Sequence, residues 1–190
     1  SIRIKEELGD ENKDILYMGL GGIYHDMYEL DKAIDYYDRS QRCLEKTGRK
    51  FSMLHYFHNC ASVYQTKGDY KKALKNFFKT CQMVEDIDDK YRMRLSYFCI
   101  GEVYYLLNDY PESLEYLNKS LAMQQDSGIT GLALETNIYL SLIYKKLAKD
   151  YDIEEIHALI KEAENIEFEV NLRLYQLLED KSYLETAYNQ

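Results

Sequence analysis

The stretch Met18-Gly19-Leu20-Gly21-Gly22-Ile23-Tyr24 (MGLGGIY) decides the fold, because its pattern recurs along the chain. Counterparts follow at steps of 40 residues, as HNCASVY at 58–64, FCIGEVY at 98–104 and IYLSLIY at 138–144. In all four, the third position is apolar, the fourth is small and the last is tyrosine. Self-similarity at one fixed period is the signature of a repeat protein.

Each repeat is predicted to be a helical hairpin, and the second repeat shows this best. Apolar residues at helical spacing predict one helix over 51–66 and another over 71–84. Between them, Gly68 suits the left-handed conformation and Asp69 suits the cap of the following helix. In the third repeat, Pro111 is predicted to fall in the first turn of the second helix, where its missing N–H is tolerated.

The glycines of the opening stretch are therefore predicted to lie in a helix and not in a loop. Gly21 belongs to the column of small residues, which lets two helices approach closely. We expect this column to face Ala33 and its counterparts at 73 and 113. A glycine in a helix costs about 1 kcal/mol relative to alanine, so Gly19 and Gly22 need another reason.

The order of residues within a repeat carries a family resemblance. The first repeat shows it as Tyr17, Leu20, Gly21, Tyr24, Leu30, Ala33 and Tyr37. It recurs as Phe57, Cys60, Ala61, Tyr64, Gly68, Tyr70, Ala73 and Phe77, and as Tyr97, Ile100, Gly101, Tyr104, Tyr110, Ser113 and Leu117. In this order the chain resembles the tetratricopeptide repeat, whose usual unit is shorter, about 34 residues. It is similar to the long-repeat branch of kinesin light chains and bacterial signalling proteins. The resemblance implies an all-α fold, a right-handed superhelical array of antiparallel helix hairpins.

We expect a single array over 1–190. Its predicted parts are the end of a preceding repeat at 1–9, repeats at 10–48, 49–88, 89–128 and 129–167, and a degenerate repeat or cap at 168–190. Residues 1–9 resemble 40–48 and 120–128, so we expect a piece of a longer protein. Near the other end the break at 149–151 comes one residue late. Further helices are predicted over 152–166, 168–178 and 182–188, and we favour a degenerate repeat that continues into further chain.

Composition argues against several classes of partner. The net charge of −9 disfavours nucleic acid and anionic membranes. No apolar run reaches the length of a membrane span and the start does not resemble a signal peptide, so the cytoplasm is the expected location. The four cysteines, at 43, 60, 81 and 99, have no paired short spacing and are expected to be reduced core residues.

We expect neither catalysis nor a cofactor nor a metal. The segment Gly19–Gly22 lacks the Lys-Ser/Thr and the preceding strand of a phosphate loop. His55 and His58 lie one turn apart, but a metal site needs three or four convergent ligands, so two polar surface histidines are expected. Lysines at 67, 71, 75 and 79 form a basic stripe, expected to be a solvated convex face, with docking of an anion or acidic protein as the alternative.

The resemblance implies a concave groove lined by the first helix of each hairpin. The predicted partner-binding residues are Gly19, Gly22, His25, His55, His58, Asn59, Ser62, Gln65, Phe98, Glu102, Tyr105 and Tyr139. Further groove positions include Asp26, Glu135, Ile138, Leu142 and Lys145, and their acidic members would repel the acidic tail of a chaperone. We expect a groove that is narrow and polar at Gly22, Asn59 and Ser62 and aromatic at Phe98, Tyr105 and Tyr139. Gly19 and Gly22 either let a ligand backbone approach or relieve a clash with a preceding repeat.

The predicted function is a protein–protein interaction module that binds a peptide or helix in this groove. By analogy with the family branch, it would be a scaffold or sensory segment of a larger bacterial signalling protein. One alternative is an intramolecular regulatory domain of a multidomain enzyme, such as a nucleotidyl cyclase, kinase or ATPase. The other is a homotypic assembly module whose uncapped repeats associate end to end.

Overall fold

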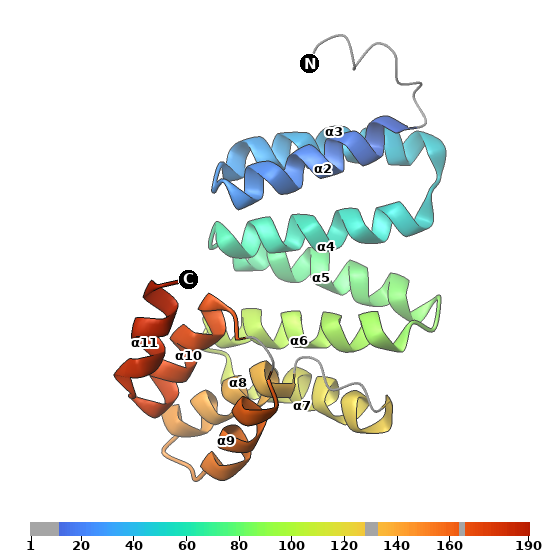
Figure 1. The fold of residues 1–190 in the computed structure, drawn as a ribbon. Coiled ribbons are helices and arrows are strands. Elements are labelled where there is room, and N and C mark those ends of the chain that lie inside the picture. Colours follow the sequence, from blue (N-terminus) through green and yellow to red (C-terminus); the bar gives the residue numbers. More distant parts are fainter. Residues whose placement is uncertain (1–11, 128–132, 164–165) are drawn as a thin grey trace. The chain divides into compact units, whose positions relative to one another are not determined.

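The structure, a computed structural model, describes residues 12–127, 133–163 and 166–190 (Figure 1). Within these ranges the regular structure is entirely α-helical, which confirms the all-α prediction. The chain divides into two compact units, Ser1–Ser96 and Tyr97–Gln190, with the boundary inside helix α6 (Lys90–Leu106). None of the helices in the described ranges has the length and apolar character needed to cross a bilayer.

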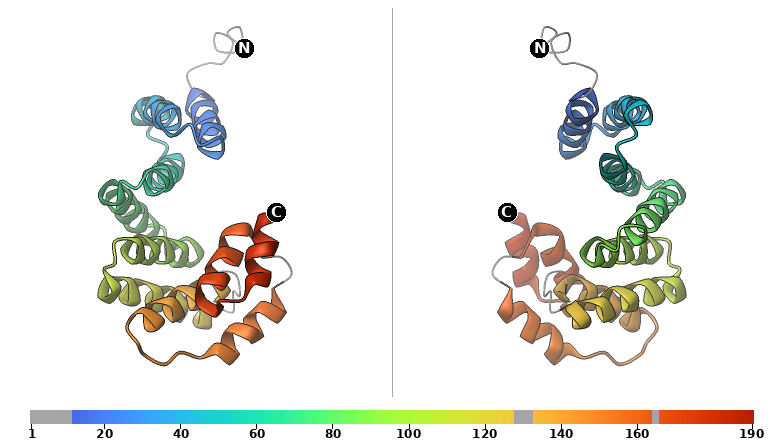
Figure 2. Two further views of the ribbon diagram at one scale, coloured as in Figure 1. Left: turned by 90° about the vertical axis from the view of Figure 1, so that its left-hand side faces the viewer. Right: turned by 90° about the vertical axis from the view of Figure 1, so that its right-hand side faces the viewer.

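The first unit contains two helical hairpins. The helices are α2 (Lys13–Asp26), α3 (Leu30–Thr47), α4 (Lys50–Thr66) and α5 (Tyr70–Glu85), followed by the first turns of α6. The two helices of each hairpin lie side by side in Figures 1 and 2. Ala33, Tyr37 and Leu44 of α3 form a buried cluster with Tyr56, Cys60 and Val63 of α4, so the first hairpin packs on the second.

The second unit contains the rest of α6 and five further helices. They are α7 (Tyr110–Ser127), α8 (Ala133–Lys146), α9 (Ile153–Glu162), α10 (Phe168–Leu178) and α11 (Lys181–Tyr188). One buried cluster joins Phe98 and Leu117 to α8 residues Tyr139, Leu140 and Ile143. A second cluster joins α8 to α9 and α10, so α8 is covered from two sides.

The turn inside each hairpin repeats with the period of the sequence. Backbone φ is positive at Tyr28, Gly68, Asn108 and Ala148, with values of 57°, 79°, 60° and 52°. Four residues earlier, the tyrosine carbonyl of each repeat accepts a hydrogen bond of 2.8–2.9 Å from the N–H five positions ahead. The left-handed Gly68 and the Asp69 cap, which accepts from the N–H of Lys72, are both as predicted.

The fourth turn keeps this register, so the prediction of a break one residue late was wrong. Ala148 occupies the left-handed position in phase with the earlier repeats. What shifts is the next helix, which begins at 153, whereas its counterparts begin at 30, 70 and 110. The carboxylate of Asp152 sets this start, because it accepts the N–H of Glu155 at 3.0 Å.

The small column faces a different column from the one expected. A Cβ on Gly21 would lie 2.6 Å from the ring of Tyr37, and one on Gly101 would lie 2.8 Å from Leu117. The nearest neighbours thus lie one turn beyond positions 33 and 113, since the helices are antiparallel and Gly21 is several residues from the turn. Ser113 does reach the column, where its hydroxyl donates to the carbonyl of Gly101 at 2.7 Å.

The predicted C-terminal helices are found with small shifts. Helix α10 spans the predicted 168–178, and α11 begins one residue before the predicted 182. Helix α9 is shorter than predicted, because the chain leaves helical conformation at Ala163. The similarity of residues 1–9 to 40–48 lies outside the described residues.

Candidate functional site

The predicted groove residues of α2 lie at a partly open surface. Gly19 is exposed, and no described atom lies within 4 Å of the position that a Cβ would take. Gly22 is half-buried, with the hydroxyl of Tyr37 3.8 Å from its Cβ position. The Nε2 of His25 lies 2.9 Å from the hydroxyl oxygen of Thr66, which joins α2 to α4. Both glycines therefore leave space that a side chain could fill.

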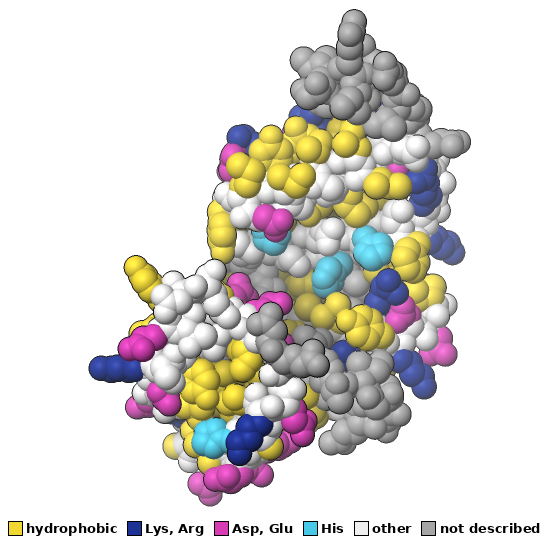
Figure 3. Space-filling model, in the orientation of Figure 1, with side chains coloured by type: hydrophobic (Ala, Val, Ile, Leu, Met, Phe, Trp, Pro, Cys, Tyr) yellow, Lys and Arg dark blue, Asp and Glu magenta, His cyan; other side chains and the backbone are white. Residues whose placement is uncertain are grey.

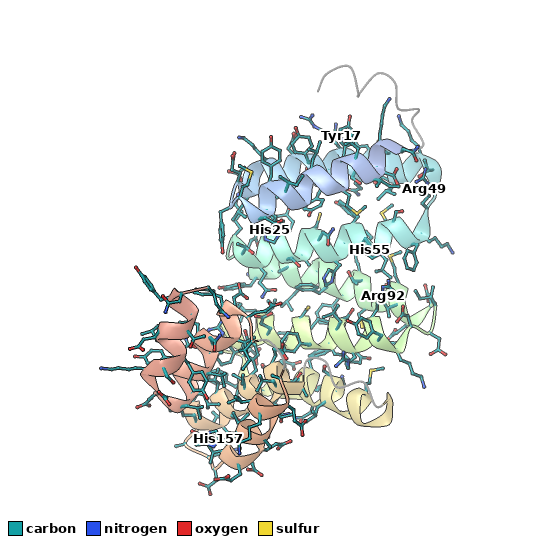
Figure 4. All side chains as sticks on the ribbon, viewed as in Figure 1. Tyr17, His25, Arg49, His55, Arg92 and His157 are labelled. Carbon is teal, nitrogen blue, oxygen red and sulfur yellow. The ribbon has the colours of Figure 1, made fainter. Side chains whose placement is uncertain are left out.

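His55 and His58 are half-buried, so they are surface histidines only in part. The ring of His55 contacts Phe51 edge-on at 5.2 Å, and the ring of His58 contacts Phe77 at 5.7 Å. The guanidinium of Arg92 lies 4.8 Å over Phe51 and near His55 (Figure 4). Burial, followed by the charge of Arg92, lowers the pKa of His55; burial, followed by His55, lowers that of His58.

The other groove residues predicted on α4 are also half-buried and polar; they are Asn59, Ser62 and Gln65. The hydroxyl of Ser62 donates to the carbonyl of His58 at 3.3 Å, within the helix. None of the three is among the fully buried residues of the core. The first helix of the second hairpin thus presents amide, hydroxyl and imidazole groups to whatever lies against it.

Helix α2 carries an apolar stripe that was not predicted. Ile15, Ile23 and Met27 are 57%, 55% and 59% exposed, and hydrophobic side chains gather over α2 in Figure 3. Their spacing places them on one side of the helix together with Gly19. Position 23 corresponds to Val63 in the next repeat, which is fully buried against α3. The repeat alignment, which pairs Ile23 with Val63, was the signal in the sequence that could have revealed this stripe.

The aromatic residues predicted for the second half of the groove form a cluster in the second unit. Phe98 and Tyr139 are buried, and Tyr105 is half-buried. The ring of Tyr139 packs edge-on against those of Phe98 and Tyr105, with centroids 5.8 Å and 5.2 Å apart. The sequence correctly grouped these three residues, but it did not predict that two of them are buried.

Helix α10 covers α8 positions that were expected to face an open groove. Ile138 and Leu142 are 1% and 3% exposed, in a cluster with Leu174 and Leu177 of α10. The Nζ of Lys145 donates to the carbonyls of residues 176 and 177, at 3.3 Å and 2.9 Å, and to Glu179 at 2.7 Å. The expectation of an open groove along this part of α8 is corrected, because its apolar residues are needed to bury α10.

A cavity of about 180 Å³ remains beside this contact. Its lining residues are Phe98, Glu102, Glu135, Ile138, Tyr139, Glu167, Glu169, Val170 and Arg173. The hydroxyl of Tyr139 donates to the Oε1 of Glu102 at 2.5 Å, and the guanidinium of Arg173 lies 5.5 Å over the tyrosine ring. Burial, together with the negative charge of Glu102, raises the pKa of Tyr139. The cavity holds four carboxylates against one guanidinium.

Four of these lining residues were missed from the sequence, namely Glu167, Glu169, Val170 and Arg173. They lie in α10 or at its N-cap, where the 40-residue period has ended and no column of equivalent residues exists for comparison. The available signal was local: Arg173 lies four residues after Glu169, so both are on one side of the helix.

The predicted lysine stripe is partly engaged within the first unit. Lys67 forms an ion pair with Asp31, and the Nζ of Lys79 lies 4.6 Å over the ring of Phe57. Lys71 and Lys75 are exposed. A continuous anion-binding stripe is therefore not the arrangement that the structure describes.

Known proteins were compared with the sequence and with the fold. Residues 14–86 match the family described as tetratricopeptide repeat. No curated protein matches the sequence. The apo form of RapI superposes with a TM-score of 0.78 at 14% identity, over 98% of this chain and 54% of that one. Aspartyl phosphate phosphatase F from Bacillus subtilis gives 0.79 at 16% identity, over 96% and 50%.

A third similar structure is a signal transduction ATPase with numerous domains that has a tetratricopeptide repeat sensor, from Pyrococcus horikoshii. Its TM-score is 0.71 at 19% identity, over 93% of this chain and 26% of that one. The chain thus spans about half the length of the first two structures and a quarter of the third. At these identities the similarity shows the fold alone.

Proposed function

Because residues 14–86 belong to the tetratricopeptide repeat family, we propose that the chain is a protein-interaction module that binds a peptide or a helix. The ligand lies against the first helices of the hairpins, and the chain acts as a scaffold or sensory segment of a larger signalling protein. The sensor of the archaeal ATPase supports the second part by analogy of fold. Cys43, Cys60 and Cys99 are thiols, which fits the reducing cytoplasm.

The observation that carries this proposal is the half-buried polar surface of α4. The recurring apolar residues of each repeat are buried between helices and cannot contact a ligand. His55, Asn59 and Ser62, which lie beside them on α4, remain partly exposed. Amide, hydroxyl and imidazole groups on a rigid helix can pair with the main chain of an extended peptide. Gly22, on the neighbouring helix α2, would let such a main chain come close.

The proposal is tested by selecting binders from a peptide display library with the native chain as the target. Ser62→Arg fills the polar surface of α4 with a long charged side chain, and should abolish binding of the selected peptides. Gln82→Arg, on the exposed side of α5, adds the same charge elsewhere and should leave binding unchanged. Circular dichroism checks that both variants fold. If the selected peptides bind the Ser62→Arg and Gln82→Arg variants equally well, α4 is not part of the binding surface.

A second candidate function is self-association through α2, and the exposed apolar stripe favours it. Ile23 corresponds to Val63, which is buried in the next repeat, and Ile15 and Met27 extend the exposed apolar stripe around it. Sedimentation velocity at increasing concentration should then show a dimer that Ile23→Glu dissociates. A chain that stays monomeric at high concentration would exclude this candidate without affecting the first.

A further inference from the structure

We propose that the cavity of the second unit binds the basic side chain of a partner peptide, a lysine or an arginine. The inference rests on the proposed function, since the ligand is again a peptide. It adds a chemical class of ligand and a specific pocket. Three features of the cavity carry it: its charge, its aromatic wall and its size.

The charge of the cavity selects a cation. Glu102 is engaged by the hydroxyl of Tyr139 and lies near Arg173, so these groups largely satisfy one another. Glu135, Glu167 and Glu169 line the same cavity, and the structure gives none of them an ion pair among the residues it describes. Three carboxylates around one hollow repel an acidic ligand and attract a basic one.

The aromatic wall favours a cation that is partly desolvated. Phe98 and Tyr139 line the cavity and are 8% and 5% exposed, so their rings are fixed by packing. The chain already uses this chemistry, because the guanidinium of Arg173 lies over the ring of Tyr139. Rings and carboxylates together bind an ammonium or guanidinium group more strongly than either feature alone.

The size of the cavity limits the ligand to one side chain. At about 180 Å³ it is smaller than the roughly 300–1,000 Å³ of pockets that enclose whole drug-sized ligands. A lysine or arginine side chain can enter with its charged end among the carboxylates, while the peptide main chain stays outside.

The test is a titration followed by chemical shifts of the amides in nuclear magnetic resonance. The probe is the peptide Ac-Ala-Ala-Arg-Ala-Ala-NH2, and its neutral counterpart carries citrulline in place of arginine. The arginine peptide should bind at least about tenfold more tightly, with the largest shifts at 135–139 and 167–173. Equal affinity of the two peptides, or shifts elsewhere, would overturn the inference.

The variant for this test is Glu135→Gln/Glu167→Gln/Glu169→Gln, which removes three charges but spares the contact between Glu102 and Tyr139. It should lose the preference for arginine over citrulline. The matched control is Glu154→Gln/Glu155→Gln/Glu162→Gln on α9, which makes the same change of charge at exposed positions outside the cavity. A preference lost equally in both variants would show a long-range charge effect and overturn the assignment of the pocket.

The outcome is separable from that of the proposed function. Display-selected peptides that are blocked by Ser62→Arg, together with equal affinity of the arginine and citrulline probes, would leave the proposed function standing and remove this inference. Binding of the arginine probe at the cavity, with no peptide selected by display, would support the pocket and count against peptide recognition along α4.

Discussion

At Gly21 the ring of Tyr37 fills the space that a side chain would occupy. The tyrosine is 1% exposed and belongs to the buried cluster between α3 and α4, so its neighbours oppose movement of the ring. Burial raises its pKa to about 12, and the phenol therefore stays neutral throughout the physiological range. This one contact explains why position 21, in the middle of α2, requires a glycine.

Gly21→Ala should therefore destabilise the chain by about 1–3 kcal/mol, the usual cost of overpacking a core. Gly19→Ala should instead stabilise it by up to about 1 kcal/mol through helix propensity, since its Cβ would meet open space. Urea denaturation measures both changes. Equal effects of the two substitutions would mean that the ring of Tyr37 does not set the requirement for a small residue.

His55 and His58 should make stability depend on pH. Their folded pKa values lie below the ordinary value of 6.5, so the unfolded chain takes up protons first as the pH falls. Their contribution is constant above about pH 6.5, and stability is lost between 6.5 and the lowered folded values. His55→Gln/His58→Gln should flatten this part of the profile in urea titrations. An unchanged slope between pH 7 and pH 5 would contradict the burial of the two rings.

At the scale of the element, the hairpin turns use one backbone conformation with four different residues. Tyrosine, glycine, asparagine and alanine occupy the left-handed position of the successive turns. For an L-residue this conformation costs roughly 1–2 kcal/mol, and glycine adopts it freely. The repeat therefore places even Tyr28 and Ala148, which do not favour this conformation locally, in the left-handed turn position.

Ala148→Gly should stabilise the chain by about 1 kcal/mol for this reason. Gly68→Ala is the reverse substitution at the equivalent position, and should destabilise by a similar amount although its Cβ would meet no atom. Thermal denaturation of the two variants measures the changes. Stability changes of the same sign in the two variants would show that neighbouring contacts, and not backbone φ, determine the effect of these substitutions.

Lys145 joins α8 to the end of α10, and its removal should loosen that contact. Its ammonium group binds the carbonyls of residues 176 and 177, and a cation at a helix C-terminus contributes up to about 1 kcal/mol. Lys145→Met should lower stability by that order and increase amide hydrogen exchange in α10. Lys146→Met, an exposed neighbour, is the control for loss of charge. Unchanged exchange in α10 would mean that the apolar cluster alone holds this helix.

The elements themselves could be predicted from the sequence because apolar spacing reports helices locally. Even the non-repeating segment 168–178 was identified as a helix. The packing of α10 was not predictable in the same way. Ile138 and Leu142 are apolar whether they face a ligand groove or a following helix, so the pattern alone does not distinguish the two environments. The same limit applied to Phe98 and Tyr139.

At the scale of the whole molecule, the repeat explains the first unit and only part of the second. In the first unit the period predicts the buried positions of the second helices, as in the pairs Ala33 and Ala73, and Tyr37 and Phe77. In the second unit the period ends after Ala148, and the cavity forms where α10 packs on α8. Its acidic residues on α10 could not be predicted, because columns of equivalent residues exist only within repeats.

The most direct test of the central claim maps a display-selected peptide on the chain by amide chemical shifts. Recognition along the first helices predicts that the largest changes lie in α4, around residues 55–62. Changes confined to α3, α5 and α7 would place the partner on the second helices and contradict the account.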